Sequence, residues 1–227
     1  EKKNIKCLYI MGENPMVSDP DINHVRNALS SLDFLIVQDI FFTETAELAD
    51  VVLPAASFAE KDGTFTNTER RVQRVRKAID PVGDAKPDWQ ILMELMNRLG
   101  YSKKYLDPSE IMDEIRSVTP QYAGITYDRL EKEGIQWPCP DVNHPGTKFL
   151  HEKAIARGRG LFMPVDHMES AETPDKEYPF ILTTGRILYH YHTRTMTGRV
   201  EELNKISSKS YVEINETTAN KLGISNG

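Results

Sequence analysis

The sequence has few cysteines, no long apolar run and no excess of positive charge, and each shortage excludes a class of protein. Its two cysteines, Cys7 and Cys139, lie too far apart to form a CxxC-type cluster-ligand motif. Apolar runs such as residues 34–37 are far shorter than a membrane span. Lys and Arg number 28 against 34 Asp and Glu, which argues against a broad face that neutralises nucleic-acid phosphates. We therefore predict no nucleic-acid partner and no direct membrane insertion.

A glycine-rich GxGxxG turn is also missing, which argues against NAD binding even though strand-like and helix-like stretches alternate early in the chain. Residues 5–11, 34–37 and 50–54 are apolar and rich in β-favouring types, a pattern typical of strands covered on both faces. Residues 22–32 keep a helical spacing between the first two strands. Strands joined by helical crossovers pair in parallel, so we predict an α/β fold with a partial parallel sheet of the Rossmann-like kind.

Polar residues follow two of these predicted strands, at the edge where an open α/β sheet binds its ligands. Gly12 permits a close approach of the backbone, and Asn14 can pair with a polar ligand edge. Gln38 and Asp39 end the second strand, where an acidic residue can accept hydrogen bonds from a ribose or a purine. These features predict a nucleotide-binding scaffold.

Residues 57–77 are first polar and then basic. The cations are Arg70, Arg71, Arg74, Arg76 and Lys77. Val72 and Val75 alternate with them, so the segment is interpreted either as a solvated strand or hairpin, or as an edge that binds an anion. For residues 74–77 we favour the solvated strand or hairpin.

Three helices are predicted in the middle of the chain, over residues 89–99, 110–118 and 121–131. Gly100 follows the first of them in the position of a C-terminal stop. Residues 135–147 hold three prolines, which exclude a helix. A short strand is predicted over 161–164, and the polar stretch 169–177 is the best domain boundary in the chain.

Beyond that boundary the pattern changes to that of a β-type domain. Residues 178–184 and 210–214 are predicted strands. A short helix is predicted over 217–222, with Gly223 as its stop. The chain is therefore expected to hold the beginning of a second domain.

Five motifs occur in an order that matches one family. They are MGENP, QDIFFTETAELADVVLPAA, GTFTNTERRVQ, QWPCP and TTGRILYHYHTRTMTGR. With them the chain resembles the molybdopterin oxidoreductases, and most closely the catalytic subunit of formate dehydrogenases. The resemblance implies that residues 1–170 are the later part of a discontinuous α/β domain that binds a molybdopterin guanine dinucleotide. It implies that residues 171–227 begin a C-terminal β-barrel domain that binds the same cofactor.

The resemblance also implies a cofactor and the residues that contact it. The cofactor is a bis(molybdopterin guanine dinucleotide) centre with molybdenum or tungsten. Phosphate and nucleoside contacts are implied for Gly12, Glu13, Asn14 and Ser18. Ribose and guanine contacts are implied for Gln38, Asp39 and Thr43. Contacts from the second domain are implied for Arg186, His190, His192, Thr193, Arg194 and Thr195.

The chemistry of these residues suits the cofactor, although each has a structural alternative. Guanine's N1–H and N2–H groups suit a carboxylate, and a pyrophosphate needs backbone N–H groups, hydroxyls and cations. The alternatives are a turn cap for Asn14, a helix cap for Asp39 and an ion pair for Arg194. With the resemblance the ligand interpretation is favoured for Gly12, Asn14, Gln38, Asp39 and Arg186. The two histidines rank below these, because histidines are common on exposed strands.

The resemblance assigns no catalytic residue and no metal ligand to this chain, because neither cysteine matches the metal-ligand position. A metal-ligating cysteine or selenocysteine, a catalytic histidine and an iron–sulfur cluster are expected upstream, so this segment alone would be inactive. The implied partners are the remainder of the catalytic chain, an iron–sulfur electron-transfer subunit and formate or carbon dioxide as substrate. The expected compartment is the cytoplasm, unless an upstream export signal directs otherwise. The alternatives are a nitrate reductase catalytic subunit and a non-catalytic homologous subunit of a respiratory complex.

Overall fold

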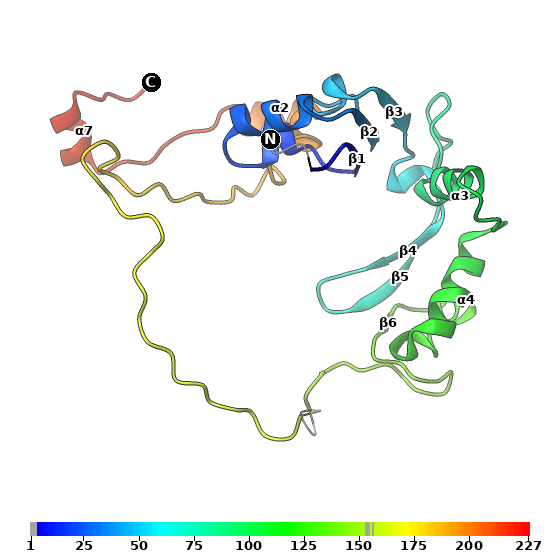
Figure 1. The fold of residues 1–227 in the computed structure, drawn as a ribbon. Helices are drawn as coiled ribbons and strands as arrows, with labels where there is room; N and C mark the ends of the chain where they lie inside the picture. The colour runs from blue at the N-terminus through cyan, green and yellow to red at the C-terminus, as the bar shows by residue number, and fades with distance from the viewer. Residues whose placement is uncertain (1–3, 153–154, 156) are drawn as a thin grey trace. The chain divides into compact units, whose positions relative to one another are not determined.

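The computed structural model describes residues 4–152, 155 and 157–227. Figure 1 shows its helices and strands in order along the chain. The chain divides into two compact units. The first unit holds residues 1–13 and 26–169, and the second holds residues 14–25 and 170–227. Each unit has its own secondary structure.

The first unit contains the predicted parallel sheet. Its strands are β1 (Cys7–Met11), β2 (Phe34–Asp39) and β3 (Val51–Pro54), in the order β1-β2-β3. Both pairings are parallel, with Ile10 opposite Val37 and Val37 opposite Val52. The central strand is the most enclosed, since Val37 is fully buried. This confirms the mixed α/β class and the parallel sheet.

Helical segments make the crossovers between these strands, as the spacing of apolar residues predicts. α2 (Ile22–Ser30) joins β1 to β2 and buries Leu29. The short 3-10 helix η1 (Ala46–Leu48) joins β2 to β3 within the stretch expected to be helical. The turn predicted after β1 contains a helix of its own, α1 (Pro15–Ser18), with proline in its first turn.

A second, antiparallel sheet follows in the same unit. β4 (Gly63–Thr66) and β5 (Arg71–Val75) form a hairpin, and β6 (Ile135–Gln136) pairs with β5. The hairpin interpretation of the basic segment is therefore confirmed for its strands. The core on this sheet is one cluster of buried side chains, made of Val72, Met112, Ile125, Leu130, Ile135 and Cys139.

The helices of this unit agree with the prediction in two cases out of three. α3 (Asp88–Arg98) precedes Gly100, whose φ of +91° places it in the left-handed region that favours glycine. α4 (Pro108–Val118) is capped by Asp107, which accepts a hydrogen bond from the Ser109 N–H at 2.8 Å. The single helix predicted over 121–131 is wrong. It is replaced by η3 (Pro120–Tyr122) and α5 (Tyr127–Leu130), because the N–H of Gly124 between them donates to the Cys139 carbonyl.

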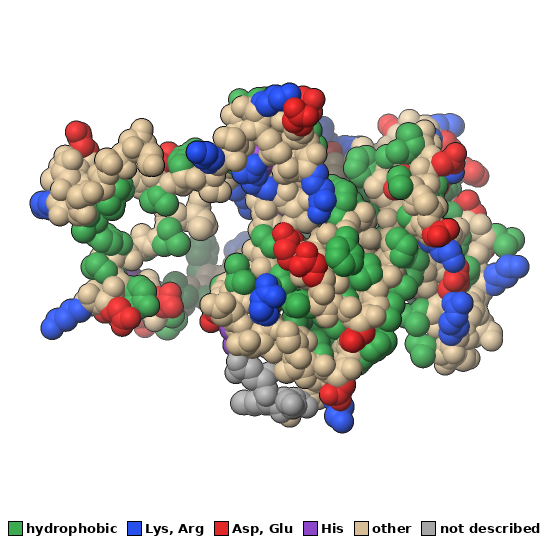
Figure 2. All heavy atoms as spheres, turned by 90° about the horizontal axis from the view of Figure 1, so that it is seen from above, with side chains coloured by type: hydrophobic (Ala, Val, Ile, Leu, Met, Phe, Trp, Pro, Cys, Tyr) green, Lys and Arg blue, Asp and Glu red, His purple; other side chains and the backbone are tan. Residues whose placement is uncertain are grey.

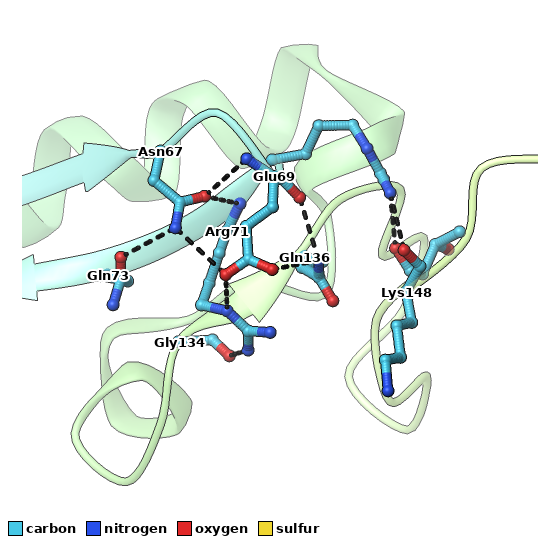
Figure 3. A network of polar contacts seen from close by, with 9 residues as sticks. Asn67, Glu69, Arg71, Gln73, Gly134, Gln136 and Lys148 are labelled. Carbon is cyan, nitrogen blue, oxygen red and sulfur yellow. Dashed lines mark hydrogen bonds and ion pairs between the residues drawn. The ribbon is translucent and has the colours of Figure 1, made fainter.

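Figure 3 shows the hydrogen bonds and ion pairs that the residues at the tip of the hairpin form. The Asn67 side-chain oxygen accepts from the backbone N–H groups of Glu69 and Arg71, and the Arg71 guanidinium donates to the Glu69 carboxylate at 2.9 Å. Arg70 donates to three carbonyls of the loop after β6. These cations are engaged within the protein, which favours the hairpin over the anion-binding alternative.

The described residues of the second unit form helices but none of the strands that the sequence predicts. Besides α1 and residues 22–25 of α2, its elements are η4 (Thr197–Arg199), α6 (Glu201–Ile206) and α7 (Glu216–Leu222). α7 ends at Gly223 with a φ of +68°, as predicted. Strands over 178–184 and 210–214 are wrong for the described residues, and so is the strand over 161–164 in the first unit. A strand needs a hydrogen-bonded neighbour, and these extended stretches pair with none in the described part of the chain.

Two further features of the structure agree with the composition of the chain. Within the described residues, no helix combines the length and the apolar character that crossing a bilayer requires. On the face drawn in Figure 2, acidic and basic side chains are mixed with hydrophobic ones and form no single basic field.

A buried carboxylate fixes the segment between the two sheets of the first unit. Glu60, at the end of η2 (Phe58–Glu60), accepts from the N–H groups of Ser57 at 2.7 Å and Val82 at 2.9 Å. The Ser57 N–H, then the Ser57 side chain and the Val82 N–H, hold the pKa of Glu60 below its usual value. A carboxyl with a lowered folded-state pKa stabilises the fold at neutral pH. That contribution is lost as the pH falls through the folded-state pKa.

We expect Glu60→Gln to weaken this dependence on acid. Between pH 7 and about pH 4, the free energy of unfolding should fall less in the variant than in the wild type. Urea unfolding followed by circular dichroism at both pH values measures the difference. Glu172→Gln, at an exposed position, is the matched control and should behave as the wild type does. Equal acid sensitivity of E60Q and the wild type would contradict this role of Glu60.

Candidate functional site

The carboxyl ends of β1 and β2 form the candidate site in the first unit. Gly12 follows β1 with a φ of +65°, and its N–H donates to the Gln38 carbonyl at 2.9 Å. A Cβ on Gly12 would meet nothing within 4 Å, so the requirement for glycine here is conformational and the space beside it is open. Asp39 ends β2, and its carboxylate accepts from the Phe41 N–H at 2.9 Å. Thr43 is buried and accepts from the Ala46 N–H at 3.2 Å.

Gln38 lies at the centre of a buried chain of polar side chains. It is fully buried, its Oε1 accepts from the Tyr9 hydroxyl, and its Nε2 donates to Asp88 Oδ1 at 2.6 Å. The Lys61 ammonium forms an ion pair with the other oxygen of Asp88. Burial, and then the charge of Asp88, raise the pKa of Tyr9, so its hydroxyl stays protonated and able to donate at neutral pH.

The sequence analysis assigned no role at this site to Asp88 or Lys61. The backbone beside β3 explains how Asp88 reaches the site. Lys86 N–H donates to the Pro54 carbonyl at 3.2 Å, and Ala56 N–H donates to the Lys86 carbonyl at 2.8 Å. Residue 86 thus continues the parallel sheet beyond β3, and α3 begins two residues later at the same edge. The sequence feature that could have pointed to Asp88 is its place directly after Lys86-Pro87, because the residue before a proline favours an extended backbone.

A cleft of about 270 Å³ adjoins this chain of polar groups. Asp88 and Lys61 belong to its lining, and the rest is mainly apolar. The apolar lining residues are Phe65, Val75, Trp89, Pro108, Ile111, Met112, Ile115 and Tyr127. A concave apolar surface with a few convergent polar groups is typical of a ligand site.

The second unit brings together three of the predicted residues. Asn14 is buried, and its Nδ2 donates to Thr195 Oγ1 at 3.4 Å. The hydroxyls of Thr193 and Thr195 lie 3.3 Å apart. Ser18, in α1, donates instead to its neighbour Asp19 at 3.1 Å. The unit therefore has one cluster of amide and hydroxyl groups contributed by two distant stretches of sequence.

His190 is buried and both of its ring nitrogens are engaged. Nε2 lies 2.7 Å from the Ser207 carbonyl and Nδ1 lies 3.0 Å from Thr197 Oγ1. Since a carbonyl only accepts, Nε2 must donate to it. In the neutral ring Nδ1 then accepts from the threonine. His190 is thus held inside its unit, and the cofactor contact implied for it remains a prediction.

The remaining predicted residues of this unit lie in a tight and partly exposed turn. His192 and Arg194 have φ values of +51° and +69°, in the left-handed region that residues with a Cβ adopt at a cost of about 1 kcal/mol. Arg194 donates to Asn204 Oδ1 at 2.7 Å and to the Ser208 carbonyl at 3.1 Å. Arg186 is exposed. Glu13, in the first unit, is also exposed.

Comparison with known families explains why these residues occur together. Residues 1–98 match the family described as molybdopterin oxidoreductase. Residues 180–227 match the family described as molydopterin dinucleotide binding domain. The chain therefore belongs to the molybdopterin oxidoreductases, and these matches support a molybdopterin cofactor.

Curated relatives match nearly the whole chain. It is 61% identical to the F420-dependent formate dehydrogenase subunit alpha of Methanocaldococcus jannaschii, over 99% of this chain and 34% of the relative. In Methanococcus maripaludis, the F420-dependent formate dehydrogenase 2 subunit alpha is 54% identical and the formate dehydrogenase 1 subunit alpha is 52% identical. Each of these two also aligns over 99% of this chain and 34% of its own length. The chain thus spans about a third of the length of these relatives.

Proposed function

We propose that the intact protein is the catalytic alpha subunit of a formate dehydrogenase, which interconverts formate and carbon dioxide. The observation that carries this proposal is the 61% identity to a formate dehydrogenase alpha subunit over 99% of the chain. The proposed cofactor is bis(molybdopterin guanine dinucleotide) with molybdenum or tungsten. When bound, that centre supplies the two-electron redox chemistry, and this chain supplies binding groups and an electrostatic environment.

The sheet edge of the first unit has the donor and acceptor set that a guanine nucleotide requires. An ionised carboxylate has about four lone-pair sites, and Asp88 uses one on each oxygen for Gln38 and Lys61. The remaining sites suit the adjacent N1–H and N2–H donors of guanine. Gly12 leaves open space beside its backbone, and Asp39 adds a second carboxylate for ribose hydroxyls. The residues present therefore fit the nucleotide end of the cofactor.

The second unit offers a different set of polar groups that suit a polar part of the cofactor. Asn14, Thr193 and Thr195 offer amide and hydroxyl groups within one cluster. Arg186 is an exposed cation, and cations bind phosphate oxygens through charge-assisted hydrogen bonds. Six further residues are proposed to contact the cofactor because of their positions in the motifs. They are Glu13, Ser18, Thr43, His190, His192 and Arg194.

Domain organisation and partners belong to the same proposal. We assign residues 1–170 to an α/β cofactor-binding domain of the Rossmann-like kind, and residues 171–227 to the start of a β-barrel domain. Iron–sulfur clusters and an iron–sulfur partner subunit would carry the electrons away from the proposed centre. The names of the relatives suggest coenzyme F420 as a final acceptor. The proposed compartment is the cytoplasm.

Formate-dependent reduction of a redox dye by the intact purified protein, together with its metal content, tests this function. We expect dye reduction that requires formate, and molybdenum or tungsten bound to the protein. Nitrate reduction without formate oxidation would identify the nitrate reductase alternative. Well-folded protein without either metal would contradict the proposal and favour a non-catalytic homologue.

A further inference from the structure

The turn of residues 190–199, which carries several of the proposed cofactor contacts, is held by a side chain that belongs to none of the five motifs. Asn204 lies in α6, after the last motif ends at Arg199. Its Oδ1 accepts from the Arg194 guanidinium at 2.7 Å, and its Nδ2 donates to the Gly198 carbonyl at 2.6 Å. One half-buried side chain therefore ties α6 to two points of the turn.

Arg194 is the residue on which the contacts of this turn converge. Its guanidinium also donates to the Ser208 carbonyl at 3.1 Å, and its own carbonyl accepts from the Gly198 N–H at 2.8 Å. Its φ of +69° lies in the left-handed region, which a residue with a Cβ keeps only where its surroundings hold it there. Asn204 contributes to that hold through the Arg194 side chain and through the Gly198 peptide.

The presence of asparagine within α6 supports a specific role for its side chain. Asparagine is less favourable than leucine inside a helix, because its side chain competes for hydrogen bonds with the backbone. Asn204 instead uses both its oxygen and its nitrogen on the turn. Helix formation alone therefore does not account for asparagine at this position.

Holding Arg194 also sets the spacing of the threonines on either side of it in sequence. The hydroxyls of Thr193 and Thr195 lie 3.3 Å apart, and the Thr195 hydroxyl accepts from Asn14. The backbone of Arg194 joins the two threonines, so its conformation fixes where their hydroxyls lie. Polar groups that are already in place bind a ligand more tightly, because less ordering has to occur on binding.

We propose that Asn204 is a positioning residue for the cofactor-binding cluster of the second unit, acting through Arg194. This inference rests on the proposed function, because it assumes that a pterin guanine dinucleotide binds at Asn14, Thr193 and Thr195. It extends that function by naming the group in α6 that keeps the cluster in its binding conformation. The effect of Asn204 on the cofactor is indirect.

The test measures how fast the intact, cofactor-loaded protein releases its guanine dinucleotide cofactor. Samples are held in urea below the unfolding transition, and the guanine nucleotide that passes a filter is counted by chromatography after acid hydrolysis. We expect Asn204→Leu to release the cofactor about tenfold faster than the wild type, because a hydrogen bond to a charged group is lost. Leucine favours a helix more than asparagine does, so a weaker α6 would not explain that result.

Two further variants separate positioning through Arg194 from local packing. Asn204→Asp keeps the acceptor for the guanidinium and should release the cofactor within about threefold of the wild-type rate. In an Arg194→Met background, Asn204→Leu should add less than about a twofold effect, because the residue through which Asn204 acts is already gone. The inference would be overturned by fully additive effects of the two substitutions, or by release from Asn204→Asp as fast as from Asn204→Leu.

Asn220→Leu is the matched control, because Asn220 is an exposed residue of α7 in the same unit. It should release the cofactor as the wild type does. Thermal unfolding checks every sample, and Asn204→Ala replaces Asn204→Leu if the latter does not fold. Wild-type release from the Asn204 variant would overturn the inference and leave the proposed function intact. A well-folded wild type that carries no guanine nucleotide would instead contradict the proposed function.

Discussion

Gly124→Ala is expected to destabilise the first unit by roughly 3 kcal/mol or more, the largest effect we anticipate for a single methyl group. A Cβ on Gly124 would lie 2.0 Å from the Asp141 carbonyl oxygen, 2.5 Å from the Asp141 carbonyl carbon and 2.8 Å from Cys139 Sγ. Two of these atoms are backbone, so no side-chain rotation relieves the overlap.

The loop that would have to move is held on several sides. Gly124 N–H donates to the Cys139 carbonyl at 2.7 Å, and Cys139 N–H donates to the Gln121 carbonyl at 2.7 Å. The Arg129 guanidinium donates to the Gly124 carbonyl, to Cys139 Sγ at 3.3 Å and to the His144 carbonyl at 2.7 Å. Moving the loop by the width of a methyl group would therefore break several hydrogen bonds at once.

Urea unfolding followed by circular dichroism measures this effect, with Gly63→Ala as the matched control. A Cβ on Gly63 meets nothing within 4 Å, and its backbone is not left-handed. The control should change the free energy of unfolding by less than about 1 kcal/mol. Equal stability of G124A and G63A would show that the loop yields easily and that its close packing is not rigid.

Asp88→Asn is expected to lower the affinity of the cofactor-free protein for GDP by about 100-fold, the largest functional effect we anticipate. Asparagine keeps the shape of the side chain but replaces one acceptor oxygen with an N–H₂ group that opposes the N–H donors of guanine. The substitution also leaves Lys61 or Gln38 without its acceptor. Both effects act at the sheet edge and leave the core cluster intact.

Calorimetric titration with GDP measures this affinity, and thermal unfolding of the same samples checks the fold. Asp80→Asn is the matched control. Asp80 is exposed and pairs with Lys77 at 2.6 Å, away from the sheet edge. The control should bind GDP as the wild type does. GDP affinity retained in D88N would remove Asp88 from the proposed site.

Local patterns predicted the elements that depend on local chemistry. The parallel strands follow from buried apolar runs, and α3 and α7 end at glycines in left-handed conformations. Gly12 and Gln38 were predicted together because parallel strands end at one edge, and the hydrogen bond between them agrees with that reasoning.

Contacts between distant residues account for what the patterns could not predict. Asp88 reaches the site through the pairing of Lys86 with β3, which no local pattern encodes. The predicted helix over 121–131 is broken by a hydrogen bond from Gly124 to Cys139. The ring of His190 bonds a carbonyl 17 residues away. The strands predicted over 178–184 and 210–214 have the composition of strands, but composition cannot supply a neighbouring strand.

The guanine nucleotide content of the intact purified protein tests the central claim most directly. Acid hydrolysis followed by chromatography releases and counts the nucleotides of a bound pterin dinucleotide. We predict about two molar equivalents of GMP per chain, together with molybdenum or tungsten, as a bis(guanine dinucleotide) centre requires. A well-folded, active protein that releases no guanine nucleotide would contradict the assignment of this chain as a guanine dinucleotide-binding segment.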